Sequence, residues 1–146
     1  MKTLIIIFLF LPIFAYNQNW TRFGLFTASI LTNSIGDALN DSKHKDWGHA
    51  LNTMSIGLLL TTPLLIEVKR SDWVFYLGSY SLMRYGLFDI TYNTAKGLDP
   101  FYQGRSGTID YVTGQIPSWL VQGTKVISLC CAITWNFNQP KRKYCF

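Results

Sequence analysis

The sequence predicts an all-α fold, a small transmembrane helical bundle with three or four helices after an N-terminal signal segment. The first observation is composition: the 146-residue chain is 49% hydrophobic and only 14% charged, whereas soluble domains carry about 25% charged residues. The second is that charged residues divide the chain into apolar segments of about helix length. The third is that all five tryptophans lie at or near segment ends.

Residues 1–18 are predicted to be a signal peptide or an uncleaved N-terminal anchor. Lys2 precedes an uncharged run of 12 residues, Leu4–Ala15. A bilayer-spanning helix needs about 20 apolar residues, so this run has the length of a secretory signal. The chain then divides into a single helical membrane domain over residues 19–140 and a basic tail over residues 141–146.

Four apolar segments follow the predicted signal. They run over about Phe23–Asn40, Trp47–Ile66, Trp73–Asn93 and Pro117–Phe137. The second has 20 residues, and its only potentially charged group is His49. As a helix it would be about 30 Å long, which matches the hydrocarbon core of a bilayer.

The first segment is the most polar of the four. Small residues recur in it at every fourth position: Gly24, Ala28, Thr32 and Gly36. The adjacent ridge is polar throughout: Ser29, Asn33, Asp37 and Asp41. Small residues allow another helix to approach closely, so this segment is expected to pack among the others. Whether it crosses the membrane or is re-entrant stays open.

The tryptophans indicate where the membrane surfaces lie. They are Trp20, Trp47, Trp73, Trp119 and Trp135. Indole rings favour the membrane–water interface, where the ring is apolar and its N–H stays hydrated. We therefore expect these five residues at the membrane interface, with the lipid bilayer as the first partner. A secreted soluble helical bundle is the alternative interpretation.

Polar side chains gather at particular segment ends. Candidates for one polar cluster are Asp37, Asn40, Asp41, His49, Asn52, Arg84, Asp89, Tyr92 and Asn93. In an antiparallel arrangement the end of the first segment, the start of the second and the end of the third lie on one side. Asp89, Tyr92 and Asn93 share one helix face, and Arg84 is expected to pair with Asp37 across helices.

Three interpretations of this cluster are open. It could fix helix register through a buried Arg–Asp pair and amide hydrogen bonds. It could be a metal or hydrolytic site, with Asp37, Asp41, His49 and Asp89 supplying ligands. It could also be a path for a small molecule or ion, with His49 titrating near neutral pH. No paired-histidine motif is present, so no metal site, cofactor or catalytic residue is assigned.

The three cysteines, Cys130, Cys131 and Cys145, do not form a disulfide framework. Cys130 and Cys131 lie within an apolar run and are predicted to be buried. The aromatic residues lie in apolar runs rather than among lysines and arginines, so we expect no nucleic-acid partner.

Three stretches of the chain carry a resemblance: Gly36–Asp41, Gly48-His49 and Arg84–Asn93. They resemble motifs of uncharacterised small multi-helix membrane proteins from Bacteroidota bacteria or their phages. Asp46 shortly before His49 is also similar to a helix opening of VanZ-like membrane proteins. The resemblance implies a compartment, the inner membrane of the bacterial cell envelope, and an architecture, with no activity attached.

The leading functional hypothesis is a non-enzymatic membrane component that packs against itself or another membrane protein. One alternative is a membrane-embedded hydrolase or metal site that acts on a lipid or envelope precursor. The other is the secreted soluble helical protein.

Overall fold

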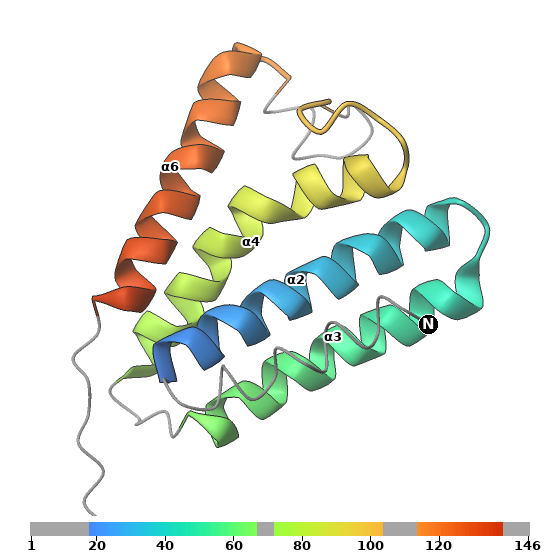
Figure 1. Cartoon of the computed structure of the whole chain (residues 1–146). Helices are drawn as coiled ribbons and strands as arrows, with labels where there is room; N and C mark the ends of the chain where they lie inside the picture. The colour runs from blue at the N-terminus through green and yellow to red at the C-terminus, as the bar shows by residue number, and fades with distance from the viewer. Residues whose placement is uncertain (1–17, 67–71, 104–113, 139–146) are drawn as a thin grey trace, which may run out of the picture.

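The computed structural model describes residues 18–66, 72–103 and 114–138. All regular structure in these ranges is helical. The four helices are α2 (Gln18–Asp41), α3 (Lys45–Leu65), α4 (Trp73–Ala95) and α6 (Ser118–Phe137) (Figure 1). The predicted all-α helical bundle, with three or four helices expected, is therefore confirmed with four helices in the described ranges. The predicted signal, apart from Gln18, and the basic tail lie outside the described residues.

A tight turn joins α2 to α3. Lys43 adopts a left-handed conformation with φ of 69°. His44 N–H donates to the Leu39 carbonyl at 2.9 Å, and Lys43 N–H donates to the Asn40 carbonyl at 3.2 Å. This pair of bonds is a Schellman motif, which ends a helix and reverses the chain. As a result α3 runs back along α2.

The same motif ends α4. Gly97 has φ of 70°, a conformation that glycine adopts without a steric penalty. Leu98 N–H donates to the Asn93 carbonyl at 2.8 Å, and Gly97 N–H donates to that of Thr94 at 3.0 Å. The chain therefore leaves α4 at once and enters the connection to α6.

Helix α2 lies between α3 and α4, and α6 packs against α4 (Figure 1). The contacts between α2 and α4 keep a constant separation of 51 residues, in the pairs Ser29–Tyr80, Asn33–Arg84 and Asp41–Tyr92. A constant separation means that these two helices run parallel. The end of α2, the start of α3 and the end of α4 therefore lie together, at what we call the polar end.

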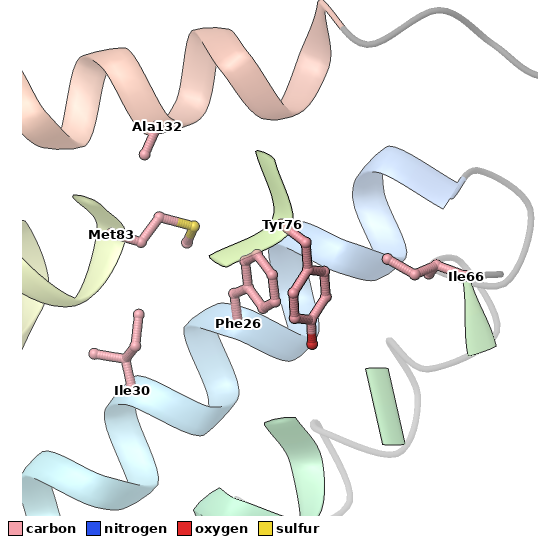
Figure 2. Close-up of a cluster of buried hydrophobic side chains, with 6 residues drawn as sticks. All are labelled: Phe26, Ile30, Ile66, Tyr76, Met83 and Ala132. Carbon is pink, nitrogen blue, oxygen red and sulfur yellow. The ribbon is translucent and has the colours of Figure 1, made fainter. Parts of the chain in front are cut away.

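The apolar core lies toward the opposite end of the bundle. It consists of Phe26, Ile30, Ile66, Tyr76, Met83 and Ala132 (Figure 2). The Phe26 ring meets the ring of Tyr76 edge to face, with 4.9 Å between centroids. Met83 extends between Ile30 and Ala132 and so connects α4 with both α2 and α6 (Figure 2).

Outside this core, many large apolar side chains are exposed and several polar side chains are buried. Large apolar side chains lie on the outside, among them Trp47 at 72% exposed, Leu64 at 79% and Val74 at 75%. Among the described residues, the buried polar or charged ones are Ser29, Ser34, Ser55, Thr62, Ser79, Asn93, Lys125 and Asn136. Such residues are usually found at the surface of a water-soluble domain.

Two sequence predictions bear on this surface. Cys130 and Cys131 are exposed, so the prediction that they are buried is wrong. Within the described ranges, no helix combines the length and the apolar character that crossing a membrane requires.

Candidate functional site

The candidate site is a line of polar side chains on α2 that contacts both neighbouring helices. Its residues on α2 are Ser29, Asn33, Asp37 and Asp41, which recur at every fourth position and so lie on one helix face. Its partners are Ser55 and Asn52 on α3, and Tyr80, Arg84 and Tyr92 on α4. We call this set the polar row.

Two glycines bring α2 and α3 together beside the polar row. A Cβ atom added to Gly36 would lie 2.9 Å from the Gly48 carbonyl, and one added to Gly48 would lie 2.7 Å from the Gly36 carbonyl. Neither position has room for a side chain. The buried Oδ1 atom of Asn40 also lies against Gly48 and has no hydrogen-bond partner among the described residues.

Hydrogen bonds connect α2 and α3 along the row. The hydroxyls of Ser29 and Ser55 lie 3.0 Å apart, and Ser55 Oγ donates to the Ser29 carbonyl at 2.8 Å. Asn33 Nδ2 donates to Asn52 Oδ1 at 3.1 Å, and Asn52 Nδ2 donates to Asp37 Oδ1 at 2.7 Å. The side chain of Asn52 therefore joins the amide of Asn33 to the carboxylate of Asp37.

Arg84 reaches the row from α4. Its Nη1 atom donates to Asn33 Oδ1, and its guanidinium carbon lies 4.4 Å from the centroid of the Phe88 ring. The described residues contain no ion pair between Arg84 and Asp37. The predicted direct pair is therefore wrong, because the two side-chain amides of Asn33 and Asn52 lie between the charges.

The stripe of α4 that begins at Arg84 continues to the polar end. The rings of Phe88 and Tyr92 stack with 6.3 Å between centroids, and Lys96 Nζ lies 5.6 Å from the Tyr92 centroid. Tyr92 donates a hydrogen bond to Asp41 Oδ2, and Lys96 Nζ lies 3.7 Å from the same oxygen. Two cations with two aromatic rings between them therefore follow one face of α4.

Asp89 and Asn93 belong elsewhere, although they were expected to act with Tyr92. Asp89 Oδ2 accepts a hydrogen bond from Lys125 on α6 at 2.6 Å. Asn93 Nδ2 donates to the carbonyls of Pro100 and Tyr102 and holds the loop after α4. Of the three, the structure places only Tyr92 in the polar row, because the three side chains reach three different parts of the fold.

His49 is also separate from the polar row. It is exposed, and no hydrogen bond joins its imidazole to the described residues. The reason is helix rotation, since Gly48 rather than His49 faces α2. Within the described part of the chain, no three His, Cys, Asp or Glu residues come close enough to hold a metal ion.

Lys125 was not identified from the sequence, although a lysine within an apolar segment is a signal that could have found it. Its side chain is only 7% exposed, while that of Asp89 is 51% exposed. Gly86 of α4 lies against Leu129 and the Lys125 carbonyl, with 3.0 Å from each to an added Cβ. This close contact brings α6 near enough for the ion pair.

A second polar cluster at the opposite end was also missed. Asn136 is 1% exposed and donates to Ser79 Oγ at 2.6 Å and to the Ala132 carbonyl at 2.9 Å. Arg22 Nε donates to Asn136 Oδ1 at 2.6 Å, and Arg22 Nη2 donates to the Asn136 carbonyl at 2.8 Å. These bonds tie the start of α2 to the end of α6.

The tryptophans lie near helix ends. Trp47 and Trp119, near the starts of α3 and α6, are the most exposed, at 72% and 71%. Trp20 and Trp73 are exposed at the starts of α2 and α4. Trp135 is half-buried near the end of α6 and packs edge to face on Phe75, with 5.5 Å between centroids.

Comparisons with known proteins give no match: no family model, curated protein or solved structure is similar to this chain. The resemblance to Bacteroidota membrane proteins stays a prediction.

Proposed function

We propose that the chain is an integral, non-enzymatic component of a membrane, in which its apolar outer faces contact lipid and its polar row holds the helices together. The observation that carries this proposal is the reversed burial. Exposed Leu64 and Val74 contrast with fully buried Ser29 and Thr62. Many large apolar side chains exposed on one small bundle suit contact with lipid or with another protein, and polar groups inside a membrane protein face the bundle interior.

The tryptophans support the same arrangement. Trp47 and Trp119 lie at one end of the bundle, and Trp20, Trp73 and Trp135 lie near the other. The helices have 20 to 24 residues, which corresponds to about 30–36 Å. That length matches the spacing of the two headgroup regions of a bilayer.

Polar side chains between the helices account for the modest mean hydropathy of each helix. Each helix contributes polar side chains to the interior, for example Asp37 on α2, Arg84 on α4 and Lys125 on α6. An average over the whole helix mixes these inward residues with the outward apolar face. Small and polar residues at helix contacts are typical of membrane bundles, where no hydrophobic force drives helices together.

Membrane fractionation tests the proposal. We expect the tagged chain to stay in the pellet through an alkaline carbonate wash and to leave it when detergent is added. Its mass in the same sample shows whether residues 1–18 have been removed. Release by carbonate alone would contradict the proposal.

We also propose that this membrane is the inner membrane of a bacterial cell envelope. Separation of inner from outer membranes tests this location.

A further inference from the structure

Helix α3 contains a proline, Pro63, two residues before the helix ends at Leu65. Proline has no backbone N–H, so the helix cannot supply the donor that normally binds the carbonyl four residues earlier. In α3 that carbonyl belongs to Leu59. A carbonyl that is removed from water and left without a donor costs free energy. The Leu59 carbonyl therefore needs a donor from another part of the chain.

The hydroxyl of Tyr76, in the first turn of α4, is that donor. Tyr76 Oη donates to the Leu59 carbonyl at 2.8 Å. Tyr76 is only 3% exposed, and its ring packs edge to face against the rings of Phe26 and Trp73, with 4.9 Å and 5.4 Å between centroids (Figure 2). The packed ring holds the hydroxyl in place. The bond also joins α3 directly to α4, whereas most of α3 packs along α2.

The residues beside the proline show what this bond controls. Thr62 interacts with the Tyr76 hydroxyl, but its own Oγ1 atom donates to the Leu58 carbonyl at 2.6 Å. Neighbouring helices and threonine side chains are the groups that compensate for prolines in membrane helices. Ile66, whose N–H donates to the Thr62 carbonyl at 3.1 Å, lies in the core. The direction of residues 62–66 therefore decides whether Ile66 stays in the core.

We propose that Pro63 forms a hinge in α3 and that the Tyr76 hydroxyl holds this hinge in one position by replacing the missing backbone donor. When the bond opens, residues 62–66 bend away from α4 and Ile66 leaves the core. The inference does not depend on the membrane location, because the bond joins two helices of the same chain.

The test measures backbone amide exchange by NMR on the full chain purified in detergent. Leu65 and Ile66 report on the end of α3, and Met54 reports on its middle. Tyr76→Phe removes the hydroxyl alone, and Pro63→Ala supplies an N–H for the Leu59 carbonyl. Tyr80→Phe is the matched control, since this hydroxyl is one turn along α4 and lies 3.5 Å from Ser29 Oγ on α2.

Tyr76→Phe should raise the exchange rates of Leu65 and Ile66 at least about tenfold, because the Leu59 carbonyl loses its donor. The rate at Met54 should stay within about twofold of wild type, since the opening is local. Tyr80→Phe should leave all three rates within the same limit. In the Pro63→Ala background, Tyr76→Phe should raise the rates of Leu65 and Ile66 less than about threefold, because the new N–H binds the Leu59 carbonyl.

Unchanged rates at Leu65 and Ile66 in Tyr76→Phe would overturn the inference. An equal rise at Met54, or the same rise in Tyr80→Phe, would also overturn it, because the bundle would then be loosened as a whole. An equal effect of Tyr76→Phe in both backgrounds would show that the hydroxyl does not replace the donor that Pro63 lacks.

Two outcomes concern folding itself. If Tyr76→Phe does not fold alone, recovery of folding by added Pro63→Ala would support the hinge, and failure in both backgrounds would overturn it. If Pro63→Ala does not fold, the contrast between Tyr76→Phe and Tyr80→Phe decides. None of these results changes the outcome of carbonate extraction, which tests the membrane location separately.

Discussion

The contact between α2 and α3 and the contact between α4 and α6 hold helices together by different chemistry. Between α2 and α3, Gly36 meets Gly48 and the side-chain hydrogen bonds join hydroxyls, amides and one carboxylate. Between α4 and α6, a buried lysine forms an ion pair with Asp89. The first contact has a glycine on both helices and no ion pair, whereas the second has one glycine, Gly86, and a pair of opposite charges.

This difference sets how each contact should fail. A glycine contact fails when any atom is added, because backbone atoms on both sides cannot move independently of their helices. An ion-pair contact fails according to which partner is removed, because an uncompensated charge is costly only where it is buried. The variants below separate these two modes, from the largest expected effect to the smallest.

Replacing Gly48 should have the largest effect. In Gly48→Ala the new Cβ would lie 2.7 Å from the Gly36 carbonyl, so α2 and α3 must separate. We expect the free energy of unfolding to fall by about 3 kcal/mol or more, measured by thermal unfolding in detergent. Gly57→Ala is the matched control on α3, since nothing lies within 4 Å of an added Cβ there. Equal destabilisation by both variants would contradict the close contact.

Asp89→Asn should be the more damaging of the two ion-pair variants. It leaves the buried charge of Lys125 without a counter-ion, which costs about 3 kcal/mol. Lys125→Met leaves a carboxylate that is 51% exposed and can be solvated, so we expect about 1 kcal/mol. Denaturant titration of both variants gives the order. The reverse order would show that Asp89, rather than Lys125, is the buried partner.

Asn52→Ala should have an intermediate effect. It removes the acceptor for Asn33 and the donor for Asp37, and hydrogen bonds inside membrane bundles average well below 2 kcal/mol. We expect about 1–2 kcal/mol in the same unfolding assay. Asn52→Asp, which keeps the acceptor and places a second carboxylate beside Asp37, should be worse than Asn52→Ala. An unchanged free energy of unfolding in Asn52→Ala would show that the polar row does not stabilise the contact between α2 and α3.

His49→Ala should have the smallest effect, within about 0.5 kcal/mol of wild type. Its imidazole is exposed and outside the polar row. Neighbouring Gly48 provides the contrast, because one step along the helix separates the largest expected effect from the smallest. A fall of more than about 1 kcal/mol in His49→Ala would show that the imidazole makes a stabilising contact.

The sequence predicted the helices and the face of α2 that carries the polar row. Periodicity was sufficient, because Ser29, Asn33, Asp37 and Asp41 recur at the helical repeat and could only share one face. The short connection before α3 also predicted correctly that Asn52 and Asp37 lie at one end. These features depend on spacing along the chain, which a sequence records directly.

Partner choice could not be predicted, because it depends on helix rotation. A turn of 100° between successive residues decides that Gly48 faces α2 and His49 does not. The same rotation directs Asp89 to Lys125 instead of the polar row. Asn136 was missed because a single amide in an apolar segment gives no periodic signal, and its four hydrogen-bond contacts with Arg22, Ser79 and Met83 come from tertiary structure.

Thiol accessibility measures most directly whether the apolar outer faces contact lipid. Cys130 and Cys131 lie exposed on α6, so a water-soluble maleimide would label them quickly in water and slowly within hydrocarbon. Opened membrane fragments, with Cys145 replaced by serine, give access from both sides, and Lys45→Cys serves as the hydrated reference. We expect rapid labelling at position 45, and labelling of Cys130 and Cys131 only after denaturation. Equal rates at all three positions in intact fragments would contradict a lipid-facing surface.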